Sequence, residues 1–371
     1  MKLSIILLRF LMRKKRVIKG LGPQNLNHIC VFSNTAIGDT LFNTPVFREL
    51  KKAYPKSKIT AILNPKNASL FATNPNIDEI LLYDGRWRGF FKILKELKKR
   101  KCQVALLLHS NEPQATPLAV FAGIEYIYKF PNDKNEFNFW HSNAPMGLEK
   151  LQYVVLNRLR VLEFLGVYTK NSRLELFLQN NDKKDALLWL QSLKNELCFK
   201  HGAFFIGFNL GASNLSRQWF IFKWVELALM LLKHENIVII LTGAPNEKKL
   251  ALNFKQELLA KLEQKELIKR VCDASGEFSL NGAARLIGGL DLFISADTGP
   301  FHIAVALKTP SITLFAVAEP LASMPNYDEN LHFFIKKPRT CAPCVGKNCK
   351  YQKCMLQINA QEVYELCKKW L

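Results

Sequence analysis

The chain lacks a long uninterrupted hydrophobic segment. Its apolar N-terminal stretch, residues 3–12, is broken at Arg9 and is shorter than the roughly 20 residues that a membrane-spanning helix needs. A secretory signal would place its basic cluster before the apolar run and would end in a small-residue cleavage site, and this stretch does neither. We therefore expect neither a transmembrane span nor a signal peptide.

Acidic residues are scarce. The 31 Asp and Glu stand against 52 Lys and Arg, a formal net charge of +21, which bears on partners rather than on fold. Nucleic acid, an anionic membrane and an acidic small substrate all fit such a charge. Residues 1–20 hold no acid. We expect residues 1–25 to form a basic amphipathic arm on an anionic cytoplasmic membrane surface, the alternative being a frayed basic terminus.

The cysteine pattern is not that of a secreted disulfide framework. Nine cysteines in 371 residues without a signal peptide favour a reduced, cytoplasmic setting. Four of them could hold one structural zinc ion, although their spacing differs from two CxxC knuckles, and a disulfide pair or free thiols stay open as alternatives. These four are Cys341, Cys344, Cys349 and Cys354.

Spacings typical of nucleic-acid-binding folds are missing as well. We find no pattern of an RRM, a helix-turn-helix or a zinc finger. The only hint of such binding is the aromatic cluster of Trp87, Phe90 and Phe91 among basic residues, which suits a lipid-facing or acceptor-facing loop equally well. A basic nucleic-acid-binding protein therefore stays as an alternative from a different class, and we expect no nucleic acid partner.

Short apolar strands alternate with helices along the whole chain, which predicts an α/β fold with parallel sheets wrapped by helices. The pattern breaks at a polar segment, residues 179–185, and then restarts. We therefore expect two doubly wound domains facing a central cleft, at residues 26–190 and 191–358, and a C-terminal helix at 359–371. The expected strands lie at residues 28–33, 59–63, 80–83, 104–109, 126–128, 204–210, 237–242, 270–272, 292–295 and 311–315, the last clear one.

One stretch whose residues could bind a ligand follows the strand at residues 292–295. Asp297 and Thr298 form a turn, Gly299-Pro300 opens a small-residue helix, and His302 lies one turn further on. The unpaired N–H groups and the dipole at such a helix end favour an anion, most often a phosphate. An ordinary capped helix with a buried histidine is the alternative.

A second stretch follows the first strand. Gly38 lets the backbone approach a ligand closely, and Asp39 stands at the start of a helix. A carboxylate in a partly desolvated cleft can take a proton from a substrate hydroxyl, while helix capping is the plainer alternative. Pro45 predicts that the following helix is kinked or starts after Thr44.

Together these stretches resemble the two signatures of the heptosyltransferase family, glycosyltransferase family 9. Asn34-Thr-Ala-Ile-Gly38-Asp39 and the residues up to Pro55 resemble its N-terminal signature. Residues 297–315, from Asp297-Thr298-Gly299-Pro300 onward, resemble its C-terminal signature. The similarity runs from about residue 29 to residue 358.

The resemblance implies a GT-B architecture of two Rossmann-like domains, with the acceptor held by the N-terminal one and the nucleotide-sugar by the C-terminal one. It implies an inverting glycosyltransferase that moves heptose from ADP-heptose to a lipid A–Kdo type anionic glycolipid of the lipopolysaccharide inner core. Such an enzyme needs no cofactor or metal and works in the cytoplasm, peripherally associated with the inner membrane. A related GT-B enzyme with another nucleotide-sugar donor is the alternative.

Site residues are carried over by position. Asp39 resembles the general base, in an acceptor-side loop with Thr35 and Gly38. The residues that resemble the donor site are Asp297, Thr298, Gly299 and His302. Arg217 stands where the family usually has a phosphate-contacting Lys, and a guanidinium can bind a phosphate through two hydrogen bonds. Glu247 stands where a carboxylate holds the ribose, although a Glu at a helix start also favours the helix dipole.

Overall fold

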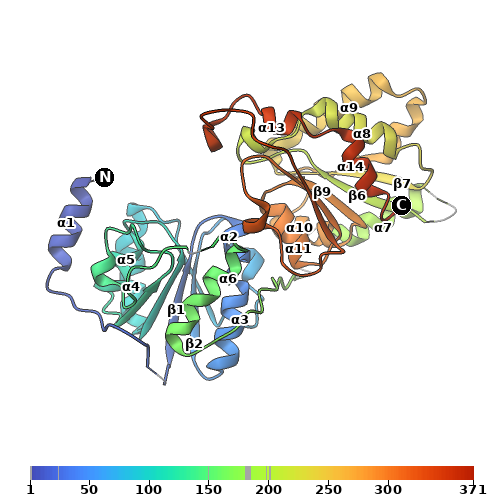
Figure 1. Ribbon diagram of the computed structural model, residues 1–371. Coiled ribbons are helices and arrows are strands. Elements are labelled where there is room, and N and C mark those ends of the chain that lie inside the picture. The colour runs from blue at the N-terminus through green and yellow to red at the C-terminus, as the bar shows by residue number, and fades with distance from the viewer. Residues whose placement is uncertain (1, 24, 149, 180–184, 198, 200–201) are drawn as a thin grey trace. The chain divides into compact units, whose positions relative to one another are not determined.

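The computed structural model describes residues 2–23, 25–148, 150–179, 185–197, 199 and 202–371. The chain divides into an N-terminal unit, Met1–Phe177, and a C-terminal unit, Leu178–Leu371 (Figure 1). This division precedes the expected boundary at 190/191, because α7 (Ala186–Leu197) packs against α10 (Leu280–Gly288) of the C-terminal unit. The expected polar segment falls largely on residues 180–184, outside the described residues.

The N-terminal unit is built on a five-stranded sheet in which the strands run parallel in the order β3-β2-β1-β4-β5. The five expected strands are confirmed to within a residue at each end. Central strands are buried apolar runs, as expected for a sheet covered on both faces. Their bounds are β1 (His28–Ser33), β2 (Lys58–Leu63), β3 (Glu79–Leu82), β4 (Val104–His109) and β5 (Tyr126–Lys129).

Helices cover both faces of this sheet. Figure 1 shows α4 (Phe90–Arg100) and α5 (Ala115–Phe121) on one face and α3 (Thr44–Ala53) and α6 (Val154–Leu159) on the other. The helix α3 starts at Thr44 with Pro45 in its first turn. The N–H groups of a first turn have no partner within the helix, so the missing N–H of proline costs nothing there. The expected start after Thr44 is confirmed to within a residue. The remaining short helices are α2 (Ile37–Leu41) and the 3-10 turns Ala68–Phe71, Trp87–Gly89, Asn138–Trp140 and Arg160–Leu165.

The N-terminal segment is a part of this unit rather than a separate arm. The helix α1 (Lys2–Met12) packs on α5 through the buried side chains of Leu8 and Met12. The indole Nε1 of Trp140 donates a hydrogen bond to the carbonyl of Met12 at 3.2 Å. The alternative of a frayed terminus is therefore wrong for this helix, because its inner face is buried in the core of the unit.

The C-terminal unit holds a six-stranded sheet with strand order β11-β10-β9-β6-β7-β8, again parallel. The expected strand at residues 311–315 is confirmed as β10, and β11, an edge strand with mostly partly exposed side chains that was not expected, follows it. The bounds are β6 (Phe204–Asn209), β7 (Ile237–Thr242), β8 (Val271–Asp273), β9 (Leu292–Ala296), β10 (Ser311–Phe315) and β11 (His332–Lys336).

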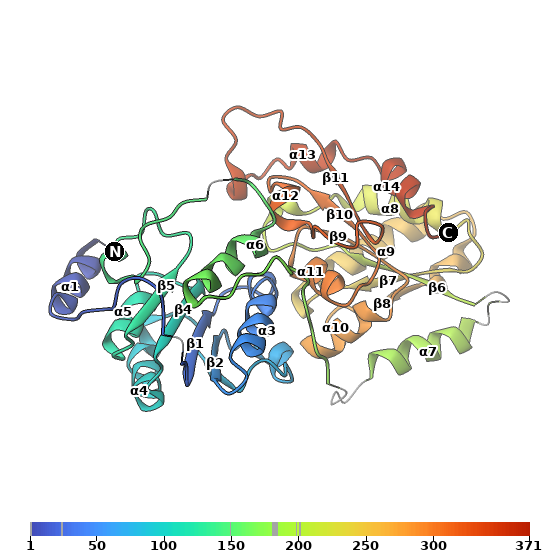
Figure 2. The ribbon, with the colours of Figure 1, turned by 60° about the horizontal axis from the view of Figure 1, so that its bottom comes forward.

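Two groups of helices sandwich this second sheet. In Figure 1, α8 (Ile221–Leu231), α9 (Lys248–Lys261) and α14 (Ala360–Cys367) lie on one face. In Figures 1 and 2, α7, α10 and α11 (Gly299–Ala306) lie on the other. The expected C-terminal helix is thus α14, which packs on α8. Short helices complete the unit: α12 (Pro320–Ser323), α13 (Lys353–Leu356) and the 3-10 turns Leu215–Arg217, Pro245–Glu247, Lys265–Arg270 and Gly346–Asn348.

Each sheet reverses its direction of strand addition at one point. In the N-terminal unit this point lies between β1 and β4, and in the C-terminal unit between β9 and β6. Doubly wound sheets bind ligands beyond the carboxyl ends of the strands at such a point. Among the described residues, no helix has both the length and the apolarity to cross a membrane.

Candidate functional site

Asp39 lies beyond the carboxyl end of β1, at the reversal point of the N-terminal sheet. It belongs to the first turn of α2, whose capping position is occupied by Ala36 without a side-chain hydrogen bond. The plainer alternative, that Asp39 caps this helix, therefore does not describe the structure. Its carboxylate instead faces residues from three other parts of the unit.

The first of these is Arg158 of α6. Its Nη2 lies 3.0 Å from the Asp39 Oδ1, and its Nη1 donates to the Asp39 carbonyl and, at 2.8 Å, to the Oδ1 of Asn43. The arginine side chain is only 6% exposed. Burial holds the pKa of Arg158 below its ordinary value, and the Asp39 carboxylate opposes that shift. This buried guanidinium therefore fixes the orientation of the Asp39 side chain.

Thr35 and His109 contact Asp39 from another side. The Thr35 hydroxyl donates to the Asp39 Oδ2 at 3.4 Å and also forms a hydrogen bond of 2.5 Å with the His109 Nδ1. The His109 Nε2 lies 3.4 Å from the Asp39 Oδ1. The Asp39 side chain remains 26% exposed and that of His109 44% exposed. The Asp39 carboxylate is therefore partly open to solvent.

The loop that carries Thr35 is held by asparagines that follow β2. The Asn64 Nδ2 donates to the Asn34 carbonyl and the Asn67 Nδ2 to the Thr35 carbonyl, each at 3.3 Å. Gly38 is buried within α2. The expected acceptor-side residues are thus Thr35 in this loop and Gly38 in the helix α2 that follows it, which also carries Asp39.

Asp297 lies at the corresponding place in the C-terminal unit, just beyond β9. Its side chain is only 6% exposed. The Arg217 Nη1 donates to the Asp297 carbonyl at 2.6 Å and lies 3.5 Å from its Oδ2. The His302 Nε2 lies 3.7 Å from the Oδ1. Arg217 follows β6, so this ion pair bridges the reversal point of the sheet.

The N-terminus of α11 stands beside this pair. Thr298 occupies the capping position, but its hydroxyl donates to the Ala296 carbonyl at 3.2 Å and caps no helix N–H. Gly299 and Pro300 form the first turn. The unpaired N–H groups at the start of a helix point out of it, together with the positive end of its dipole, although Pro300 contributes no N–H here. With the 24% exposed side chain of Arg217, this end of the sheet presents positive charge suited to a phosphate.

Glu247 lies beyond β7, next in the sheet to β6. Its Oε2 accepts a hydrogen bond from the Ala244 N–H at 2.7 Å, so part of its work is to cap the turn Pro245–Glu247. The carboxylate rests directly on Gly211, where an added Cβ would lie 1.7 Å from the Glu247 Oε1. Glycine is therefore required at residue 211 for the carboxylate to lie there.

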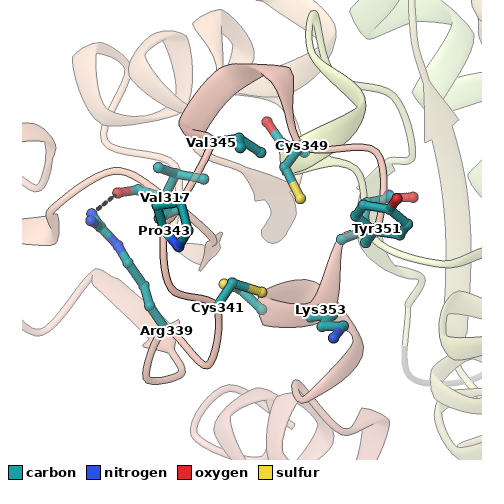
Figure 3. Close-up of a pocket in the computed structure, with 12 residues that line it drawn as sticks. Val317, Arg339, Cys341, Pro343, Val345, Cys349, Tyr351 and Lys353 are labelled. Atoms are coloured by element: carbon teal, nitrogen blue, oxygen red, sulfur yellow. Dashed lines mark hydrogen bonds between the residues drawn. The ribbon is translucent and has the colours of Figure 1, made fainter.

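The four clustered cysteines line a pocket of about 350 Å³ in the C-terminal unit. Figure 3 shows Cys341 and Cys349 on different sides of it. In the part of the chain that the structure describes, no three His, Cys, Asp or Glu side chains gather closely enough to hold a metal ion. Burial raises the pKa of the Cys354 thiol, and the other three cysteines add to the shift. The zinc candidate thus has no preformed set of ligands.

Two residues in contact with Asp39 were not among the expected site residues. His109 ends β4, and sequence reasoning placed this strand without placing it next to β1. Arg158 is 119 residues from Asp39 in the sequence. The signal that could have found it is an arginine among the apolar residues of a short buried helix.

The fold and the two sites define a class. Two Rossmann-type units in one chain, each with charged side chains at the reversal point of a parallel sheet, make an α/β protein of GT-B architecture, so the expected fold class is confirmed. The structure of a family 9 glycosyl transferase from Veillonella parvula matches with a TM-score of 0.75 at 20% identity, covering 94% of this chain and 98% of that one. The Escherichia coli ADP-heptose lipopolysaccharide heptosyltransferase II matches with a TM-score of 0.72 at 19% identity, covering 92% and 98%.

Sequence comparison gives the family. The lipopolysaccharide core heptosyltransferase OpsX of Haemophilus influenzae is 24% identical over 353 residues, covering 92% of this chain and 96% of the relative. Residues 90–355 match the model of glycosyltransferase family 9 (heptosyltransferase). The chain belongs to this family and is a glycosyltransferase, as the two signatures indicated. The matched residues include Arg217, Glu247 and the 297–302 segment, whereas Asp39 precedes them.

Proposed function

We propose that this glycosyltransferase moves a heptose from ADP-heptose to a hydroxyl of the lipopolysaccharide inner core, with inversion at the anomeric carbon. Relatives that match nearly the whole chain are named for heptosyl transfer to lipopolysaccharide, and one of the matching structures is named for ADP-heptose. The residue roles rest on one observation, which is that the two aspartate–arginine pairs differ in which member is exposed to solvent. Of the Asp39–Arg158 pair the carboxylate is the accessible member, and of the Asp297–Arg217 pair the guanidinium is.

On the donor side, the diphosphate of ADP-heptose binds at the N-terminus of α11 and to Arg217. The negative charge that grows on the leaving phosphate is stabilised by the guanidinium and by the N–H groups of Thr298, Gly299 and the following turn. Asp297 and His302 are buried beneath this surface, so they act as positioning residues that hold Arg217 and the turn. Glu247 accepts from the ribose hydroxyls with the carboxylate oxygen that does not cap Ala244.

On the acceptor side, Asp39 is the general base. As the acceptor oxygen attacks the anomeric carbon of the heptose, its proton passes to the Asp39 carboxylate and the bond to the ADP oxygen breaks on the opposite face. Because attack and departure take place on opposite faces, the anomeric centre inverts. Thr35, His109 and Arg158 keep the carboxylate turned toward the substrate.

The reaction needs no metal cofactor in this proposal, because the leaving group is stabilised by a guanidinium and a helix end. The acceptor is an anionic glycolipid of the lipid A–Kdo type. Such a lipid lies in the inner membrane, so we place the enzyme at the cytoplasmic surface of that membrane. The excess of 52 basic over 31 acidic residues fits an acceptor that carries phosphates and carboxylates.

A donor screen tests the proposal. The purified protein is incubated with a core-truncated lipopolysaccharide and, in separate reactions, with ADP-heptose, UDP-glucose or GDP-mannose, and the products are weighed by mass spectrometry. We expect a mass increase of one heptose with the ADP-sugar alone. Transfer from a UDP- or GDP-sugar instead would replace the donor assignment with the other nucleotide-sugar alternative.

A further inference from the structure

The helix α1 is apolar on two nearly opposite faces, and only one of them is covered. Leu8 and Met12 face inward onto α5 and are buried. Ile6, Leu7, Phe10 and Leu11 all face outward with more than half of each side chain exposed. Residues at i and i+4 share a helix face, so the pairs Ile6/Phe10 and Leu7/Leu11 form one outward stripe, which we call the α1 stripe.

Basic side chains surround the α1 stripe. Arg13, Lys14, Lys15 and Arg16 follow it directly and are all exposed. Arg9 lies beside it and makes an ion pair at 3.5 Å with Glu136 in which both side chains are more than half exposed. An aliphatic and aromatic stripe bordered by cations has the chemistry of an interfacial helix, whose apolar face enters the acyl region while the cations meet anionic headgroups.

A second patch of the same chemistry lies on α4, which like α1 packs against α5. Figures 1 and 2 both show α1 beside α5. Phe91 of α4 is 79% exposed, and Trp87, in the 3-10 turn just before α4, is 44% exposed. Tryptophan is enriched at the level of the lipid headgroups. Phe91 also lines a shallow hollow of about 490 Å³ whose other lining residues are Leu94, Lys95, Lys98 and Lys99. The hollow joins an apolar floor to three ammonium groups.

We propose that the α1 stripe and the basic α4 patch form one docking surface for an anionic phospholipid bilayer. The occupant is a lipid surface rather than a nucleic acid, because the exposed groups of the stripe are mostly aliphatic and offer bases little to stack on. The membrane docks on a fixed face of the N-terminal unit, since α1 is anchored by Leu8 and Met12. This surface deepens the proposed function, which it would serve by holding the enzyme at its glycolipid acceptor.

Vesicle sedimentation without any acceptor tests the surface independently of transfer. The full chain is mixed with vesicles of phosphatidylcholine alone or with phosphatidylglycerol added. We expect binding to the anionic vesicles, weakened about tenfold or more by the double substitution Leu7→Gln and Leu11→Gln. The matched control replaces two exposed leucines of helices in the C-terminal unit, Leu188→Gln and Leu252→Gln, and should leave binding unchanged.

A second pair of variants tests the charges. Lys14→Gln with Lys15→Gln should weaken binding about fivefold per removed cation, whereas Lys249→Gln with Lys261→Gln on α9 should not. Equal binding to both kinds of vesicle, or equal loss in variant and control, would overturn the proposal. So would a wild-type dimer in solution that ignores vesicles and that the stripe variant dissociates, because the stripe would then be an interface with a second copy.

Transfer assays separate this surface from the proposed function. We expect the stripe variant to glycosylate a lipid-free core oligosaccharide at the wild-type rate and a vesicle-embedded acceptor about tenfold more slowly. A wild-type enzyme that binds anionic vesicles but transfers heptose to neither acceptor would refute the function and leave the surface standing. Equal slowing on both acceptors would show that the stripe acts on catalysis, which would overturn the docking role.

Discussion

The two units place the same pair of residue types at the same point of the same fold, with opposite exposure. In the N-terminal unit the Asp39 side chain is 26% exposed, and that of its partner Arg158 is 6% exposed. In the C-terminal unit the Arg217 side chain is 24% exposed over an Asp297 that is 6% exposed. A histidine accompanies each aspartate, His109 in one unit and His302 in the other.

The difference teaches how one architecture supports two roles. In each pair the buried member is held by the surrounding structure and fixes its partner, while the accessible member can meet a substrate. An accessible carboxylate can accept a proton, and an accessible guanidinium can bind a phosphate. Our proposal therefore assigns the acceptor hydroxyl to the N-terminal unit and the diphosphate to the C-terminal unit.

The largest expected effect comes from Asp39→Asn. The amide keeps the size of the side chain but cannot take the proton, so kcat should fall about 1,000-fold. The dissociation constant of ADP, measured by calorimetry, should change less than about twofold, since in our proposal the nucleotide contacts only the other unit. Asp297→Asn is the matched variant and should act mainly on the KM for the donor. Equal losses of kcat in both variants would erase the distinction between the two aspartates.

Stability should separate the two arginines. Arg158→Leu leaves Asn43 and the Asp39 carboxylate without their buried partner, which should cost about 3 kcal/mol of the free energy of unfolding. Arg217→Leu should cost about 1 kcal/mol, because the guanidinium it removes is 24% exposed and water can take its place beside Asp297. Urea unfolding of the two variants measures both values. A greater loss for Arg217→Leu would mean that exposure does not separate the two arginines.

Arg217→Ala should weaken the donor complex. Losing a charge-assisted contact to a phosphate should raise the dissociation constant of ADP about 30-fold. Arg217→Lys restores the charge but not the planar fork, so we expect it to recover only part of the affinity. As a control, Arg339→Ala removes another partly exposed arginine of the same unit and should leave ADP binding unchanged. An unaltered affinity in Arg217→Ala would remove this residue from the donor site.

Much of the fold could be predicted from the sequence because both sheets are buried on two faces. A strand such as Ile237–Thr242 is a buried run from end to end, and such runs between turn residues stand out. The edge strand His332–Lys336 was missed because most of its side chains are partly exposed and its pattern is weaker. The packing of α1 was missed because amphipathicity shows that a helix has an apolar face but not which neighbour covers it.

The candidate site was predictable only where it is local. Asp39 and Asp297 each follow an apolar strand in a turn with a nearby glycine, a pattern contained within a few residues. Their partners come from elsewhere, since Arg158 lies 119 residues from Asp39 and Arg217 lies 80 from Asp297. Arg217 was reached through the family resemblance. No family resemblance pointed to Arg158 or His109. His109 lies near Asp39 because β4 pairs with β1, and the order of strands in a sheet cannot be predicted from one local segment of sequence.

His109 sharpens the comparison between the histidines, because it is far more exposed than His302. His109→Ala removes a contact that orients Asp39 through Thr35, so kcat should fall about tenfold with an unchanged KM for the donor. His109→Gln keeps a hydrogen-bonding group near Thr35 and should recover part of the rate. A change in donor KM with normal kcat would instead assign His109 to donor binding.

The smallest expected effect is that of a chelator. If Arg217 and the N-terminus of α11 neutralise the leaving phosphate, that step needs no divalent cation, and treatment with EDTA should change the initial rate less than about twofold. A metal held by the thiols at residues 341–354 would be measured in the protein by elemental analysis before and after the treatment. Release without loss of rate would make such a metal structural. A large loss that added magnesium restores would mean that the accessible arginine of the C-terminal unit is not enough to stabilise the leaving group, and the parallel between the two charged pairs would then hold for their geometry but not for their chemistry.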